Sequence, residues 1–173
     1  MTTEELYDKL KLIQKMKCET QNLELKSAEQ GYPKRLYDSL SSFSNQDDGG
    51  IIVFGIDEKQ DYKEVGVYDA QDIQKKINEQ CLQMNPVVRP LITVVEKENK
   101  KFVSAEIPGI DLADRPCYYQ GRGRLKGSYT RIGDSDEPMT EYEIYSYEAY
   151  RRKYQDDIRE VPRVTLMSLD QEE

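Results

Sequence analysis

The longest apolar run of this chain is Ile51–Phe54, which lies between a pair of glycines and Asp57. A short run of large apolar residues bounded by turn-forming residues is typical of a strand that is buried on both faces. Such a strand needs neighbours in a sheet and further layers above and below it. The pattern over residues 49–57 therefore predicts the central strand of a sheet that is covered by helices.

Apolar residues elsewhere either recur with helical spacing or alternate as in a strand. Leu6, Leu10 and Ile13 share one helical face, whereas Leu23 and Leu25 alternate with polar residues. The helical pattern predicts helices over residues 3–17, 33–46, 69–84 and 139–155. The remaining patterns predict strands over residues 19–26, 62–67, 87–96 and 101–107, of which the last two form an antiparallel hairpin.

The C-terminal part of the chain begins with a strong helix start and ends in a polar stretch. Thr140 and Glu143 have the spacing of a capping box. Residues 156–173 are polar, contain a proline and end in acidic residues. We therefore expect one domain over residues 1–155 and a loose polar tail or linker over residues 156–173.

Composition narrows the classes of chemistry that are open to the chain. Its 173 residues contain no histidine, which excludes Ser-His-Asp and Cys-His catalysis and histidine-ligated zinc. Three cysteines that lie far apart argue against a disulfide framework. No apolar run reaches the length of a membrane span, and the N-terminus lacks the features of a secretory signal. We expect a cytoplasmic protein without a membrane partner.

Charge is distributed unevenly along the chain. The net charge is −8, which argues against nonspecific binding of nucleic acid by the whole surface. Residues 115–131, however, contain five basic residues and no acidic one. With Tyr119 and two further tyrosines nearby, a flexible hairpin here has the groups for phosphate contact and base stacking. A solvated loop that balances an acidic body is the alternative. The basic residues are Arg115, Arg122, Arg124, Lys126 and Arg131.

A second candidate site consists of carboxylates near strand ends. Glu19, Glu24 and Asp57, with Lys26 beside them, could hold a hard divalent cation such as Mg²⁺ or Mn²⁺. Such a cation would activate water and stabilise charge on a phosphate group. The alternative is that these residues are ordinary surface charges on an exposed strand face.

Five segments taken together resemble a known family, the Schlafen AlbA-like domain. This domain is also called the divergent AAA-type DNA-binding domain of bacterial transcriptional regulators. The resemblance covers residues 15–150 and rests on the order and spacing of the segments. They are Glu19-x4-Glu24-Leu-Lys26, Phe43-Ser-Asn45, Gly49 to Asp57, Pro116-x-Tyr-Tyr and Tyr129-Thr-Arg131-Ile-Gly-Asp-Ser.

The resemblance implies an α+β fold, with a mixed central β-sheet, helices packed on it and a β-hairpin. It implies DNA or RNA as the partner and further domains C-terminal to this one. In some eukaryotic members two glutamates and an aspartate form a metal-dependent RNA-cleaving site, which by motif falls on Glu19, Glu24 and Asp57. The first hypothesis is thus a nucleic-acid-binding domain of a transcriptional regulator. The alternatives are a metal-dependent endoribonuclease and a homo-oligomerisation domain with a tyrosine-rich surface.

Overall fold

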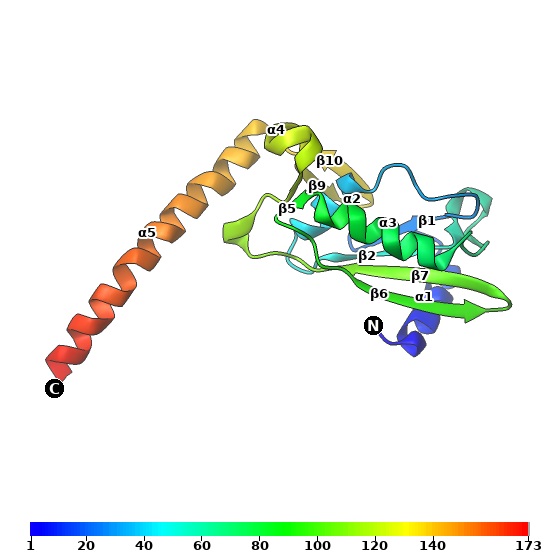
Figure 1. The fold of residues 1–173 in the computed structure, drawn as a ribbon, viewed down its shortest axis with the longest axis horizontal. Coiled ribbons are helices and arrows are strands. Elements are labelled where there is room, and N and C mark those ends of the chain that lie inside the picture. The colour runs from blue at the N-terminus through cyan, green and yellow to red at the C-terminus, as the bar shows by residue number, and fades with distance from the viewer. Residues whose placement is uncertain (173) are drawn as a thin grey trace.

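A four-stranded mixed sheet forms the centre of the molecule (Figure 1). The computed structural model describes the backbone of residues 1–172 and the side chains of residues 1–158. The strand order is β1-β2-β7-β6, with β1 parallel to β2 and the other pairs antiparallel. This arrangement confirms the α+β class and the mixed sheet. The strands are β1 (Leu23–Lys26), β2 (Gly50–Phe54), β6 (Leu91–Lys97) and β7 (Lys100–Ile107).

The apolar run around Ile51–Phe54 is the inner strand β2, as predicted, but it ends earlier than expected. Gly55 has φ +113° and turns the chain, so that Ile56–Asp57 forms a separate short strand, β3. A Cβ atom on Gly55 would lie 2.6 Å from the Phe102 ring. The predicted partner strand over residues 62–67 is reduced to β4 (Lys63–Glu64), because Gly66 at φ +73° bends the chain again.

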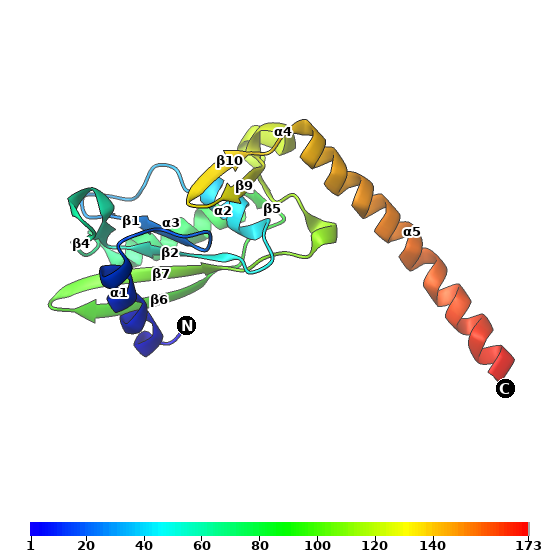
Figure 2. The same cartoon turned by 180° about the vertical axis from the view of Figure 1, so that it is seen from behind.

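Helices cover both faces of the sheet (Figures 1 and 2). Helix α1 (Thr3–Met16) lies on one face, where Leu6, Leu10 and Ile13 join a buried cluster with Val53 and Phe102. The N-cap is Thr2, whose hydroxyl accepts a hydrogen bond from the backbone amide of Glu5. Burial of these apolar side chains supplies most of the stabilisation of such a helix.

Helices α2 (Tyr37–Ser44) and α3 (Ala70–Leu82) lie on the opposite face. Helix α2 begins later than Pro33, and segment 33–36 before it is not helical. A Cβ atom on Gly50 would lie 2.4 Å from the ring of Phe43, so glycine here lets α2 approach β2 closely. Helix α3 begins within one residue of the predicted start at Asp69. Asp69 is its N-cap, and the Asp69 carboxylate accepts hydrogen bonds from the backbone amides of Gln71 and Asp72.

The predicted hairpin is present as β6 and β7, joined by a two-residue turn. Glu98 and Asn99 both have positive φ, +52° and +63°, as a type I′ turn requires. The basic segment 115–131 differs from the prediction of a flexible hairpin, because its middle is helical. It contains β8 (Tyr118–Tyr119), a 3₁₀ turn η3 (Gln120–Arg122), α4 (Gly123–Gly127) and β9 (Tyr129–Ile132).

Four short elements, which are two strands and two 3₁₀ turns, complete the body of the domain. Strand β8 pairs with β5 (Met84–Asn85), and β9 pairs with β10 (Ser135–Pro138). Two further 3₁₀ turns are η1 (Glu58–Gln60) and η2 (Leu112–Asp114). The β9–β10 hairpin lies against α2, far in sequence from the strands that it helps to fix.

A single long helix, α5 (Glu141–Glu172), projects away from the body (Figures 1 and 2). Its predicted capping box is confirmed, with reciprocal bonds of 3.1 and 3.2 Å between Thr140 and Glu143. The expected end of this helix near Gln155 is wrong, because the helix continues to Glu172. The assignment of residues 156–173 to a polar tail or linker stays a prediction. Arg, Lys, Gln and Glu are frequent beyond residue 150, and their high helix propensity favours continuation of the helix. Among the described helices, none is long and apolar enough to cross a membrane.

Candidate functional site

Arg131 lies in the interior, although it was predicted to bind nucleic acid. Its side chain is 0% exposed and bridges Glu24 at 2.7 Å and Asp136 at 2.9 Å. It also donates to the carbonyls of Thr20 at 3.0 Å and Leu23 at 2.9 Å. We call Glu24, Arg131 and Asp136 the clasp, because they tie the β9–β10 hairpin to β1. The assignment of Arg131 to a nucleic-acid surface is therefore corrected.

The clasp extends into α2 through residues that the sequence did not single out. Asp136 lies opposite Arg131 in the β9–β10 register and accepts bonds from the hydroxyls of Ser39, at 2.7 Å, and Ser42. Burial, followed by the charge of Asp136, raises the pKa of the neighbouring Asp38. A cross-strand Arg-Asp pair with a short turn between them was the one signal in the sequence for this arrangement.

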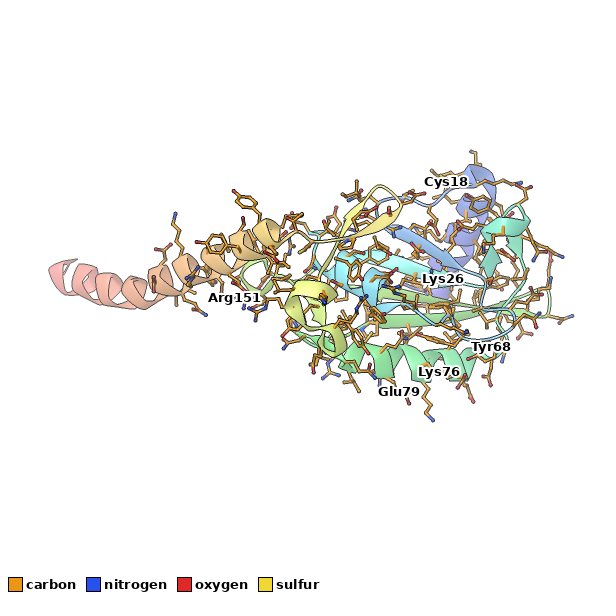
Figure 3. All side chains as sticks on the ribbon, turned by 90° about the horizontal axis from the view of Figure 1, so that it is seen from above. Cys18, Lys26, Tyr68, Lys76, Glu79 and Arg151 are labelled. Atoms are coloured by element: carbon orange, nitrogen blue, oxygen red, sulfur yellow. The ribbon has the colours of Figure 1, made fainter. Side chains whose placement is uncertain are left out.

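Arg115 is also buried, and its guanidinium binds groups of its own chain. Its guanidinium donates twice to the carbonyl of Ile110, at 2.9 and 3.1 Å, and once to Asp47 at 2.8 Å. From α5, Arg151 donates to the carbonyls of Ala113 and Arg115 and fixes the same loop (Figure 3). Arg115 therefore holds the loop that leads into β8, and its predicted contact with a nucleic acid is corrected as well.

The other three basic residues of the segment are exposed. Arg122, Arg124 and Lys126 lie within residues 120–127, which we call the basic turn. Arg124 pairs with Glu148 of α5, so part of its charge is neutralised. Within the part of the chain whose side chains are described, Arg122 and Lys126 have no carboxylate partner within ion-pair distance.

The basic turn meets a second basic segment, which precedes α2. Arg35 and Arg122 each donate to the hydroxyl of Tyr129, both at 3.2 Å. Tyr37 stacks on Tyr119, with ring centroids 4.2 Å apart and an interplanar angle of 14°. The structure thus brings exposed cations from two distant stretches of sequence to one place, with Lys34 exposed beside them.

Tyr119, which was predicted to stack on a base, already packs on protein groups. Its ring lies against Tyr37, and a Cβ atom on Gly121 would lie 2.6 Å from it. The guanidinium of Arg35 also lies 5.4 Å from the centroid of the Tyr37 ring. These rings therefore stabilise the positions of the arginines. A contact of Tyr119 with a nucleic-acid base remains a prediction.

The predicted catalytic carboxylates are engaged by donors from the protein. The Glu19 carboxylate accepts a hydrogen bond from the backbone amide of Leu25 at 2.9 Å. The Glu24 carboxylate pairs with Arg131 and also, at 3.3 Å, with Lys26. Figure 3 shows Lys26 on the sheet. Asp57 accepts bonds from the amide of Lys59 and the side chain of Gln60, at 3.0 and 2.7 Å. Asp57 thus caps the 3₁₀ turn η1.

Glu19 has the most perturbed carboxyl group of this set. Burial raises its pKa to about 7, the bond from Leu25 lowers it, and the charges of Glu24 and Glu58 raise it again. Glu58, which was not among the predicted site residues, thus adds to the effect of Glu24 on the pKa of Glu19. Among the described residues, no three side chains of the metal-binding types converge as a cation site would require. The predicted set of Glu19, Glu24 and Asp57 does not fit a shared divalent cation in this arrangement.

A groove of about 690 Å³ runs between α1 and the sheet. Leu12, Met16 and Leu91 line it with 46%, 52% and 66% of their surface exposed. It contains none of the residues predicted for a functional site. Helix α1 therefore covers only part of its face of the sheet.

Comparison with known proteins places most of the chain in one family. Residues 19–140 match the family model described as Schlafen, AlbA_2. The chain belongs to the Schlafen AlbA_2 family. In this Schlafen AlbA_2 domain the clasp and the basic turn lie within the matched residues, whereas α1 and α5 lie outside them. The family resemblance predicted from the sequence is confirmed.

Solved structures share the fold of this Schlafen AlbA_2 domain. The N-terminal domain of a RecG-related protein from Nitrosomonas europaea is similar with a TM-score of 0.58 and 26% identity, over 77% of this chain and 92% of that one. The DIP2311 protein from Corynebacterium diphtheriae has a TM-score of 0.50 and 18% identity, over 74% of this chain and 24% of that one. At that identity the second likeness concerns the fold alone. No curated protein matches the chain.

Proposed function

We propose that this Schlafen AlbA_2 domain binds nucleic acid through the basic turn together with segment 33–36. The observation that carries the proposal is the meeting of Arg35 and Arg122 at one hydroxyl, beside the exposed Lys34 and Lys126. Exposed cations gathered on one surface attract the phosphate backbone. The similar domain from Nitrosomonas europaea belongs to a protein whose name relates it to a DNA helicase, which agrees with such a partner.

The acidic remainder of the chain strengthens the proposal by restricting where a polyanion can bind. With a net charge of −8, most of the surface repels phosphates. A nucleic acid would therefore bind with its backbone along the basic turn and would be repelled elsewhere. The family resemblance also implies a role in a transcriptional regulator, and we include this role in the proposal.

The experiment is a fluorescence anisotropy titration with labelled single-stranded DNA, duplex DNA and RNA, repeated between about 50 and 200 mM salt. Four exposed cations that contact phosphates would give a logarithmic salt slope of about −3 to −4. The Arg122→Ala/Lys126→Ala variant should bind more weakly, with the slope reduced by nearly 2 because each lost contact removes about 0.9.

The matched control is Lys11→Ala/Lys15→Ala, which removes the same charge from exposed positions of α1. It should keep the affinity and the slope of the original protein. Equal weakening by both variants would show that net charge governs binding, and absence of binding at low salt to all three nucleic acids would refute the proposal.

The alternative of a metal-dependent endoribonuclease stays a prediction. Its test needs care, because Glu24 is buried beside Arg131 and a change to alanine would disturb the fold as well as any catalysis. Glu19→Gln is the better variant, since the amide oxygen can still accept the bond from Leu25. RNA cleavage that depends on Mn²⁺ and disappears in this folded variant would favour the nuclease.

Self-association through α5 also stays a prediction. Tyr142, Tyr145 and Tyr150 are exposed on the helix, by 77%, 59% and 41%. Exposed aromatic side chains are common at protein contacts. Light scattering over a range of protein concentrations measures the oligomeric state directly.

A further inference from the structure

We infer that Arg35, Arg122 and the hydroxyl of Tyr129 form a binding site for a single phosphate group, and that the nucleic-acid backbone supplies it. This inference rests on the proposed function and adds the chemistry of its central contact. One nitrogen of each guanidinium lies 3.2 Å from the Tyr129 oxygen, so the two nitrogens are at most twice that, 6.4 Å, apart. A phosphate group, with several acceptor oxygens, can accept bonds from both guanidinium groups at once.

The charge balance at this place favours an anion. Two guanidinium groups held so close repel each other unless a negative charge lies between them. Arg35 has one carboxylate partner among the described residues, Asp38, which lies within ion-pair distance at 3.8 Å from Nε but too far for a hydrogen bond. Arg122 has no such partner among the residues whose side chains are described. A bound phosphate would supply the missing countercharge.

The hydroxyl of Tyr129 points to the same ligand. It accepts a bond from each arginine, and a tyrosine hydroxyl also has one hydrogen to donate. Among residues 1–158 this hydroxyl forms no hydrogen bond as a donor. A phosphate oxygen would accept it, so that two guanidinium groups and one hydroxyl would all donate to the ligand.

The floor of the site is rigid, whereas its rim is accessible. Tyr129 is only 5% exposed, its amide donates to the hydroxyl of Ser41, and its carbonyl accepts a bond from Asn45. The side chain of Arg35 is 53% exposed, and Arg122 is exposed as well. A site whose supporting groups are fixed before the ligand arrives loses little conformational entropy on binding.

The ligand should be recognised by its phosphate and not by its bases. Tyr37 and Tyr119 are stacked on each other, and the Arg35 guanidinium lies over Tyr37. These aromatic groups hold the arginines in place, and the donors at the site match a phosphate. Phosphate contacts carry no sequence information of their own. We therefore expect similar affinity for oligonucleotides of different sequence at equal length and salt.

The test follows the side-chain NMR signals of the arginines in the full chain. Inorganic phosphate, added at constant ionic strength against chloride, should shift the Nε–Hε signals of Arg35 and Arg122. The signal of Arg124 is the internal control, because this arginine pairs with Glu148. Tyr129→Phe keeps the buried ring and removes the hydroxyl, and it should weaken phosphate binding about fivefold.

A short oligonucleotide forms the second arm and separates the two proposals. Shifts of Arg35 and Arg122 with both ligands support the site and its nucleic-acid source. Shifts with inorganic phosphate but no binding of the oligonucleotide would refute the proposed function, with free phosphate as the ligand of the site. Binding of the oligonucleotide that leaves both arginine signals unchanged would overturn the inference and leave the proposed function standing.

Discussion

Arg131 and Arg122 belong to one short basic segment, yet they have opposite environments. Arg131 is fully enclosed and binds two carboxylates and two carbonyls of its own chain. Arg122 is exposed and binds one neutral hydroxyl. The difference shows that the number of basic residues in a segment does not give the charge that a partner meets. Of the five basic residues in segment 115–131, two serve the fold and three reach the surface.

The largest effect is expected from Arg131→Met. Without the guanidinium, Asp136 would lose its ion-pair partner and Glu24 would keep only Lys26 at 3.3 Å, and the loss of the partner of a buried charge typically costs about 3 to 5 kcal/mol. Urea unfolding monitored by circular dichroism measures the loss. Glu24→Gln in the same background should recover part of it, because it removes one of the two carboxylate charges that Arg131 had balanced. An unchanged unfolding midpoint in Arg131→Met would mean that the clasp contributes no stability.

A smaller loss of stability is expected from Arg115→Ala. This change removes two bonds to the carbonyl of Ile110, which corresponds to about 1 to 2 kcal/mol. The ion pair with Asp47 adds little, because the Asp47 side chain is 91% exposed. Arg122→Ala is the matched comparison and should change the free energy of unfolding by less than about 0.5 kcal/mol. Equal losses of unfolding free energy in both variants would show that the buried and the exposed arginine contribute equally to stability.

The smallest effect expected is the pH dependence of stability that arises from Glu19, which lies near the buried Arg131. The pKa of Glu19 is about 7 in the folded protein, against an ordinary value of 4.5. Because the folded state retains the proton of Glu19 longer, the contribution of this group to stability should be fully present below pH 4.5 and should be lost as pH rises through 7. Glu19 is half-buried, so solvent reduces the expected change to about 1 kcal/mol.

Glu19→Gln should remove this part of the pH dependence in unfolding measurements between those two pH values. The control is Glu4→Gln, at an exposed position of α1, which should leave the profile unchanged. A profile that is the same in the original protein and in Glu19→Gln would contradict the raised pKa.

Local patterns predicted the elements of this fold well where apolar spacing was regular. The central strand, the hairpin β6–β7 and helices α1 and α3 appear where the sequence indicated them. The predictions were wrong about where elements end, because backbone conformation and the continuation of a helix determine those positions. Gly55 ends β2 through its positive φ, and α5 continues beyond the residues where its apolar pattern becomes irregular.

The site was predicted in part, because burial of charges depends on contacts between distant residues. The composition of segment 115–131 indicated a basic surface, and the exposure of Arg122, Arg124 and Lys126 agrees with it. The spacing of Arg131 and Asp136 is the one local feature that distinguishes Arg131 from Arg122. The burial of Arg131 depends on acceptors in a distant strand, which include Glu24 and Leu23. The contribution of Arg35 likewise depends on the packing of α2 against β9.

The clasp also has a consequence for how the chain folds. The bonds of Arg131 to Thr20 and Glu24 join residues that are 111 and 107 positions apart. Closing so long a loop costs chain entropy before any contact repays it, and proteins rich in distant contacts fold slowly. The clasp should therefore form late, after the sheet has assembled. Substitutions in it would then accelerate unfolding and leave the refolding rate almost unchanged.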